Sequence, residues 1–324
     1  MYFDNNATTK PFIESIDYAC KVMQDNWHNP SSSYEEGMAA KEVIDNARKD
    51  VSILINCQPT DLIFTSIGTE SNLSVVSSIL ESFKMPNIIT TDIEHESIIN
   101  LLMTLESEKK ITLTICKIDY STGHVKPQDL ISLITQRTRL ISVMSVNNVT
   151  GIIQPLKEIS NLLMHYRKKS GQEIYFHTDA CQSIGKMYFD LQHLGVDYAT
   201  IDGHKFYAPK VGLLYVKDCK KQNSPPIIPL FIGGGQERSL RAGKVILKNC
   251  PEIKASRGSA CQSLKTCSSE KFDGSKILIN SGYSEELAAS AIRLSFGLNN
   301  TMNEIVRAVD IIHSGVGNTF GESE

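Results

Sequence analysis

Short apolar runs alternate with helical patterns between residues 61 and 218, and this alternation restricts the fold more than any other feature of the sequence. Runs typical of buried strands lie at 61–65, 87–90, 111–118, 139–146, 173–177, 200–201 and 211–216. Helical spacing follows the first run, where Leu73, Val76, Ile79 and Leu80 share one face, and recurs at 97–105, 128–134 and 156–167. Strands that alternate with helices favour βαβ units, so we predict an α/β fold with a mostly parallel central sheet flanked by helices.

The pattern changes after about residue 223. A glycine-rich loop occupies 233–238, and a stretch rich in Ser, Gly and Ala follows at 256–267. A helix or strand is expected at 287–295 and an amphipathic helix at 304–313. We therefore predict an N-terminal segment (1–20), a large domain (21–243) and a small α+β domain (244–324), which suits a chain of 324 residues.

Composition and charge exclude several classes of function. The net charge is -3, which gives no electrostatic footprint for nucleic acid. No apolar run approaches the roughly 18 residues of a membrane helix, and residues 1–20 lack the basic and apolar regions of a secretory signal. The eight cysteines form no CxxC pair and no zinc pattern with histidine. We expect a cytosolic protein without a metal site or a membrane or nucleic-acid partner.

Two residues that follow successive predicted strands point to a cofactor. Lys205, in Gly203-His204-Lys205, is either a solvated surface lysine or a lysine whose amine condenses with a carbonyl cofactor. Asp179 is either a turn or cap residue or the carboxylate that pyridoxal phosphate (PLP) needs beside its ring nitrogen. Ligands of parallel sheets bind at the carboxyl ends of the strands, so both side chains can face one cofactor.

A third motif lies between the first strand and the first helix of the large domain. Residues 65–72 read Thr-Ser-Ile-Gly-Thr-Glu-Ser-Asn. A strand, a turn of small residues and a helix N-terminus can hold a phosphate with backbone N–H groups, although an ordinary helix N-cap explains the same residues. The stretch lacks the GxxxxGK[ST] pattern of a P-loop, so a nucleotide is not implied.

These three motifs, in this order, resemble the NifS-like branch of the class V aminotransferases. Other parts of the chain resemble that branch too, at 4–9, 29–32, 94–95, 147–151, 233–238, 241–243, 258–261 and 293–295. The resemblance covers nearly the whole chain. It implies the PLP-dependent transferase fold of type I, with PLP as cofactor.

The resemblance also implies roles for individual residues at the cofactor ring. Lys205 would carry PLP covalently, and Asp179 would pair with the ring nitrogen. His95 would stack on the ring and transfer protons. Asn148 and Gln182 would flank the phenolic oxygen of the cofactor.

Further residues would contact the phosphate and the substrate. Three phosphate contacts are implied: Gly68, Thr69 and His204. Arg293 would bind the substrate carboxylate through both guanidinium nitrogens, with Asn5 beside the substrate. Cys261 would meet the sulfur or selenium of the substrate, whereas its other interpretation is a structural loop thiol.

Two features resemble the selenocysteine lyases within this branch. The stretch 203–215 is one residue shorter after Pro209 than the usual desulfurase pattern, and the stretch after Cys261 is longer and ends in 288–295. The implied activity converts L-selenocysteine to L-alanine and selenide or elemental selenium. The alternatives are a cysteine desulfurase, which gives alanine and an enzyme persulfide, and a catalytically inactive truncated chain.

The sequence departs from the family in two places. Lys244 stands where the family has a Thr that reaches the neighbouring subunit's phosphate, and a segment the size of a small domain is missing before Cys261. Asp202 replaces a Ser of the desulfurases, and a carboxylate there would repel the phosphate unless it points away. We expect a homodimer, weakened by the missing segment, and a selenium or sulfur acceptor protein as a further partner.

Overall fold

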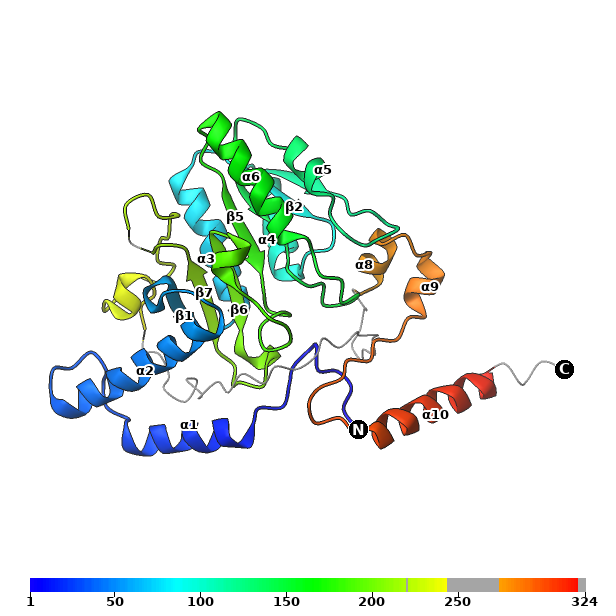
Figure 1. The fold of residues 1–324 in the computed structure, drawn as a ribbon, viewed down its shortest axis with the longest axis horizontal. Helices are drawn as coiled ribbons and strands as arrows, with labels where there is room; N and C mark the ends of the chain where they lie inside the picture. The colour runs from blue at the N-terminus through cyan, green and yellow to red at the C-terminus, as the bar shows by residue number, and fades with distance from the viewer. Residues whose placement is uncertain (220, 244–273, 320–324) are drawn as a thin grey trace.

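A sheet of seven strands forms the centre of the computed structural model, which describes residues 1–219, 221–243 and 274–319 (Figure 1). The strands are β1 (Leu62–Thr65), β2 (Asn87–Thr91), β3 (Thr112–Cys116), β4 (Thr138–Ser142), β5 (Tyr175–Asp179), β6 (Tyr198–Asp202) and β7 (Gly212–Val216). Their order is β1-β7-β6-β5-β4-β2-β3. Only β7 runs antiparallel to its neighbours within this sheet, so the predicted mostly parallel α/β fold is confirmed.

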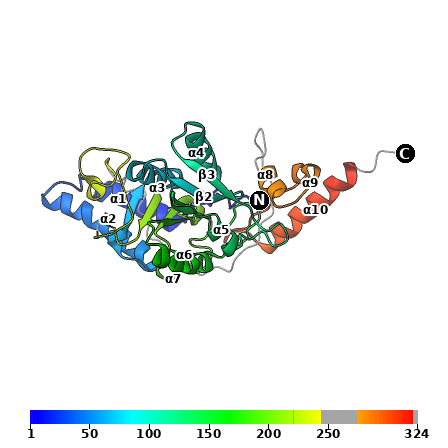
Figure 2. The ribbon, with the colours of Figure 1, turned by 90° about the horizontal axis from the view of Figure 1, so that it is seen from above.

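Helices cover both faces of the sheet because successive strand residues point to opposite sides. In β2, Ile89 packs with α2 (Glu35–Leu54) and α6 (Leu156–Ser170), whereas Ile88 packs with α3 (Gly68–Ser82) and α4 (Glu96–Ser107). Helices α5 (Pro127–Ser132) and α7 (Leu191–Leu194) lie on the side of α6 (Figure 2). The sheet is therefore the middle layer of three.

The expected helices of this domain are present, but two details differ. Leu73 is exposed, and the buried face of α3 carries Val75 in addition to Val76 and Ile79. Strand β4 ends at Ser142, four residues before the predicted end, although Val143 and Met144 remain buried. Burial continues past the end of the strand, and an apolar run alone cannot separate these two cases.

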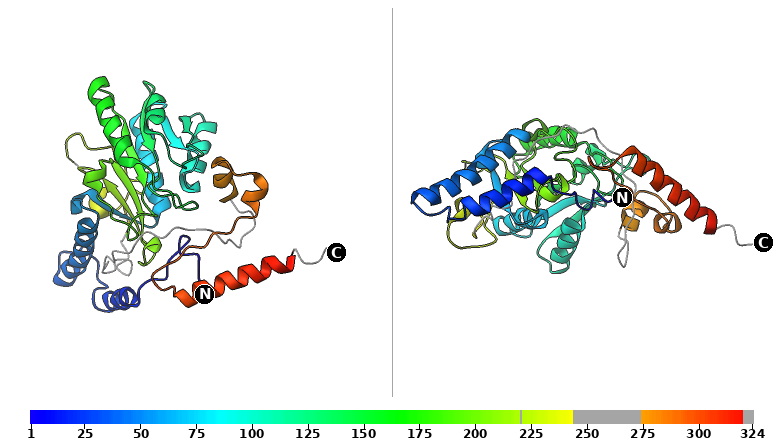
Figure 3. Two further views of the ribbon diagram at one scale, coloured as in Figure 1. Left: turned by 45° about the vertical axis from the view of Figure 1, so that its right-hand side comes forward. Right: turned by 90° about the horizontal axis from the view of Figure 1, so that it is seen from below.

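The N-terminal segment meets a later part of the chain at the edge of the sheet. Before α1 (Ile13–Asp25), the N-terminal segment pairs with the C-terminal part through a bridge between Asp4 and Ser295. Helices α8 (Gly274–Asn280), α9 (Glu285–Ala289) and α10 (Met302–Thr319) lie beside the large domain, and α10 extends away from it (Figures 1 and 3). No helix in the described part of the chain combines the length and apolar character that crossing a membrane requires.

Short 3₁₀ turns complete the framework of the large domain. They are η1 (Pro59–Asp61), η2 (Gly203–Lys205) and η3 (Gln236–Ser239). Turn η2 follows β6 directly and ends with Lys205. Lys205 therefore lies just after the carboxyl end of β6, at the carboxyl edge of the sheet.

Candidate active site

Asp179 is the last residue of β5, and its carboxylate is buried. Oδ1 accepts a hydrogen bond from the Cys181 backbone N–H (3.0 Å), and Oδ2 accepts one from Asn72 Nδ2 (3.1 Å). Burial alone would raise the pKa of Asp179, but the charge of His95 and these hydrogen bonds outweigh it, so the pKa is lowered. Among the described residues, no Lys or Arg forms a salt bridge with this ionised group.

Lys205 lies at the same edge, after the neighbouring strand β6. Its Nζ donates to the backbone carbonyls of Asn6 (3.1 Å) and Ala7 (2.8 Å). Burial lowers the pKa of Lys205, and the positive charge of Arg293 acts in the same direction. The negative charge of Asp179 opposes this shift. Neutral amine is the nucleophilic form of lysine, so a lowered pKa favours condensation with a carbonyl group.

His95 lies at the N-cap of α4, where its Nδ1 accepts from the Ser97 backbone N–H (3.1 Å). The ring is exposed, and its charge acts on the carboxylate of Asp179. The structure therefore brings His95, Asp179 and Lys205, three of the five residues expected at the cofactor ring, to the same edge of the sheet. The stacking of His95 on that ring stays a prediction.

Glu94 precedes His95 in the chain and was not among the expected site residues. Its buried Oε1 accepts from Thr91 Oγ1 and from the Met144 backbone N–H, both at 2.8 Å, whereas Oε2 is buried without a hydrogen-bond partner in the described residues. Burial raises the pKa of Glu94 to about 8. The carboxyl group is therefore largely protonated at neutral pH.

Replacing Glu94 by glutamine should remove a pH dependence of stability. The folded pKa lies above the unfolded one, so the folded state binds more protons between pH 4.5 and about 8. Wild-type stability should fall as pH rises through that range, by up to about 1.4 kcal/mol per unit, relative to Glu94→Gln. Urea unfolding of both proteins from pH 5 to 8 measures the difference. A constant difference would show that Glu94 does not titrate in this range.

The expected phosphate contacts converge at the N-terminus of α3. Gly68 begins that helix, Thr69 is exposed beside it, and His204 stands across from it in η2. The position between them is taken by Asp202, whose Oδ2 accepts from the Gly68 backbone N–H (2.8 Å) and lies 3.4 Å from His204 Nε2. The carboxylate of Asp202 does not point away from the predicted phosphate site.

The two amides expected near the cofactor oxygen are at the same edge of the sheet. Gln182 Nε2 donates to the backbone carbonyl of Asn6 (2.9 Å), and its Oε1 accepts from Lys186 Nζ (2.5 Å). Asn148 Oδ1 is buried without a hydrogen-bond partner in the described residues. Buried acceptors are nearly always hydrogen-bonded in folded proteins, so this oxygen is available to a donor from a bound molecule.

Arg293 is buried, and the protein itself contacts its guanidinium group. Nη2 donates to Asp4 Oδ1 (2.6 Å), and Nη1 donates to the backbone carbonyl of Asn148 (2.9 Å). Asn5 holds the same junction together, because its Nδ2 donates to the backbone carbonyl of Ser295 (2.9 Å). Cys261 lies outside the described residues.

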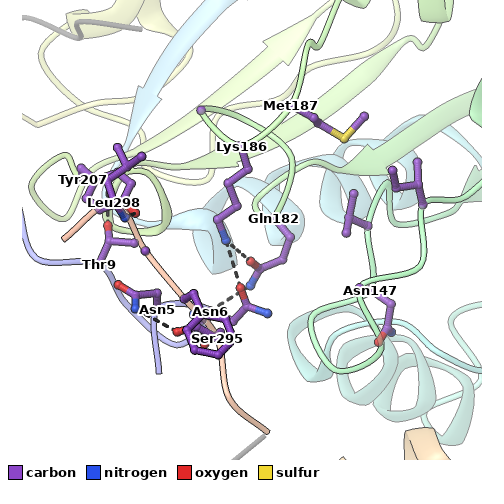
Figure 4. A pocket seen from close by; sticks show the side chains of 16 residues that line it. Asn5, Asn6, Thr9, Asn147, Gln182, Lys186, Met187, Tyr207, Ser295 and Leu298 are labelled. Atoms are coloured by element: carbon purple, nitrogen blue, oxygen red, sulfur yellow. Dashed lines mark hydrogen bonds between the residues drawn. The ribbon is translucent and has the colours of Figure 1, made fainter. Parts of the chain in front are cut away.

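A cavity of about 270 Å³ adjoins these groups (Figure 4). Asn5, Gln182, Lys186 and Tyr207 are among its lining residues, but Lys205 and Asp179 are not. The carbonyls of Asn6 and Ala7 hold Lys205, as described above. The N-terminal segment therefore covers the lysine.

Comparison with known proteins agrees with this geometry. Residues 1–253 match the family model described as aminotransferase class-V. Selenocysteine lyase of Xenopus laevis is 41% identical over 271 residues, which cover 78% of this chain and 62% of that protein. The mitochondrial cysteine desulfurase of Arthroderma benhamiae is 34% identical over 300 residues, which cover 91% of this chain and 56% of that protein.

A solved structure gives a second comparison. A NifS-like protein superimposes with a TM-score of 0.86 at 27% identity, covering 98% of this chain and 99% of that one. The chain thus spans 62% of its Xenopus relative but nearly all of this NifS-like protein. It belongs to the class V aminotransferase family, among the NifS-like members.

Proposed function

We propose that this chain binds PLP on Lys205 and decomposes L-selenocysteine to L-alanine and elemental selenium, which a thiol reductant can convert to selenide by supplying two electrons and two protons. One observation carries the proposal. A buried, ionised Asp179 and a lysine of lowered pKa, Lys205, follow adjacent strands and lie at the same edge of the sheet. When bound, PLP withdraws electrons from the substrate Cα through its protonated ring nitrogen. Asp179 would keep that nitrogen protonated, because no lysine or arginine of the described chain neutralises its charge.

The residues at the ring end fit PLP. The carboxylate of Asp179 is held in place by Asn72 and by the Cys181 backbone N–H. The buried Oδ1 of Asn148 is a hydrogen-bond acceptor that has no donor among the described residues. His95 is exposed and can move protons at the edge of the sheet. At the phosphate end the fit fails in this conformation, because Asp202 occupies the space beside Gly68.

We propose that Arg293 binds the substrate carboxylate after releasing Asp4. A planar guanidinium matches a carboxylate with two parallel hydrogen bonds, and in this structure the guanidinium of Arg293 already binds one carboxylate, that of Asp4. Cys261 would meet the selenium atom. The selenocysteine lyase relative supports this substrate, whereas the cysteine desulfurase relative supports cysteine as the alternative.

Assembly and location complete the proposal. We propose a homodimer in the cytosol and an acceptor protein that receives selenium or sulfur. A catalytically inactive chain is the second candidate, and the position of Asp202 at the predicted phosphate site favours it.

The test is anaerobic incubation of the PLP-saturated protein with each amino acid. With dithiothreitol present as the two-electron reductant, we expect equal amounts of alanine and selenide from L-selenocysteine, at a higher rate than alanine and sulfide from L-cysteine. Faster release from cysteine would assign the desulfurase activity instead. Bound cofactor with no alanine from either substrate would contradict the proposal and favour the inactive chain.

A further inference from the structure

Asp202 makes an unusual contact for a buried carboxylate. It is the last residue of β6 and is 6% exposed. Its Oδ2 accepts from the backbone N–H of Gly68, the first residue of the 15-residue helix α3. Backbone N–H groups at a helix N-terminus are a favourable position for an anion. The protein therefore supplies an anion of its own at this helix end.

The other half of the carboxylate is left unsatisfied. Asp202 Oδ1 is buried and has no hydrogen-bond partner among the described residues. The His204 ring lies beside the other oxygen, with Nε2 3.4 Å from Oδ2. A buried carboxylate oxygen without a hydrogen bond lowers the stability of the folded protein. The contribution of Asp202 to folding therefore does not explain why a carboxylate is found here.

Gly68 is packed closely against Asp202. A Cβ atom built on Gly68 would lie 3.1 Å from Asp202 Oδ2 and 3.0 Å from Cys181 Sγ. The backbone of Gly68 thus packs closely against both side chains. A phosphate that reaches the Gly68 N–H must first displace the carboxylate, or else approach it within a distance at which like charges repel strongly.

We propose that Asp202 competes with the cofactor phosphate for the N-terminus of α3 and so determines how tightly this chain binds PLP. The inference rests on the proposed function, since that function requires PLP. It predicts that the phosphate contributes little to affinity in the wild-type protein. Removing the negative charge of Asp202 should restore that contribution.

The experiment compares two aldehydes, PLP and pyridoxal, which differ by the phosphate. Each is titrated by absorbance into the wild type, Asp202→Asn and Asp202→Ser. We expect both variants to bind PLP at least about tenfold more tightly than the wild type, with pyridoxal affinity unchanged. Asparagine keeps the size of the side chain and can still accept from Gly68, so it serves if the serine variant does not fold.

A matched control is Asp190→Asn. Asp190 also accepts a backbone hydrogen bond at a helix N-terminus, from His193 of α7 (2.7 Å), but it lies outside the site. This variant should bind PLP as the wild type does. Unchanged PLP affinity in both Asp202 variants, or an equal gain for PLP and pyridoxal, would overturn the inference.

Inorganic phosphate separates this inference from the proposed function. If no variant binds either aldehyde, the proposed function is wrong. Calorimetry with phosphate alone still tests Asp202, since Asp202→Asn should bind phosphate at least about tenfold more tightly than the wild type. Equal phosphate affinity in the two proteins would overturn the inference whatever the aldehydes do.

Discussion

Replacing Asp179 by asparagine should lower alanine release from L-selenocysteine by about 10²–10³-fold, the usual cost of removing one preorganised electrostatic contact. The substitution keeps the shape of the side chain but removes the charge that would hold a proton on the ring nitrogen. Lys205 does not change, so the cofactor should still attach. Steady-state alanine release at saturating PLP gives the rate, and the visible absorbance of the bound cofactor reports its attachment.

Asp197→Asn is the matched control for that experiment. Asp197 is also a buried aspartate beside β6, but it lies at the opposite end of the strand, where Oδ2 accepts from the Phe176 backbone N–H (2.8 Å) and pairs with Arg167. Its variant should keep the wild-type rate while the protein is folded. A wild-type rate in Asp179→Asn would remove the aspartate from the proposed chemistry.

Replacing Glu237 by alanine should destabilise the large domain by about 3–5 kcal/mol, as expected when one partner of a buried ion pair is removed. Both oxygens of Glu237 bind the Arg48 guanidinium, at 2.7 and 2.8 Å, and Oε2 also accepts from the Phe64 backbone N–H (2.8 Å). Without Glu237, a buried guanidinium and a strand N–H lose their partner. Urea unfolding followed by circular dichroism measures the change.

Two further variants define the origin of that loss. The double variant Arg48→Met/Glu237→Leu should recover much of it, because no buried charge is then left unpaired. Glu108→Ala breaks the exposed pair with Lys110 and should cost no more than about 1 kcal/mol. Equal losses in Glu237→Ala and Glu108→Ala would mean that the buried pair does not hold η3 against α2 and β1.

This ion pair also shows what sequence reasoning missed in the glycine-rich loop. In the sequence, the stretch at 233–238 was recognisable only as a glycine-rich loop that resembles the family. Within the chain, Glu237 contacts Arg48, a residue 189 positions earlier. A partner so distant in sequence leaves no local pattern, because nothing in the spacing of either residue depends on the other.

The strands and the order of the site motifs could be predicted because they depend on local patterns. Apolar runs identified β2 and β5, and the residues just after strands identified Asp179 and Lys205. Asn72 was missed as a partner of Asp179 because it lies 107 residues away, although it stands one helical turn after Gly68 on α3. Its place in the motif at 65–72 was the available signal.

The orientation of side chains was the property that the sequence predicted least well. The sequence showed that Asp202 would oppose a phosphate unless it pointed away, but only the structure shows its contact with Gly68. In the same way, the pairing of Arg293 with Asp4 depends on the N-terminal segment lying against residues near 295. Such contacts follow from tertiary packing rather than from local sequence.

The most direct test of the account is to identify the lysine that carries the cofactor. The wild-type protein, saturated with PLP, is reduced with borohydride, digested and analysed by mass spectrometry. We predict the pyridoxyl group on the peptide that contains Lys205, whose amine has a lowered pKa and lies at the strand end next to Asp179. A label on Lys186, which lines the neighbouring cavity, or no label at saturating PLP would contradict the account.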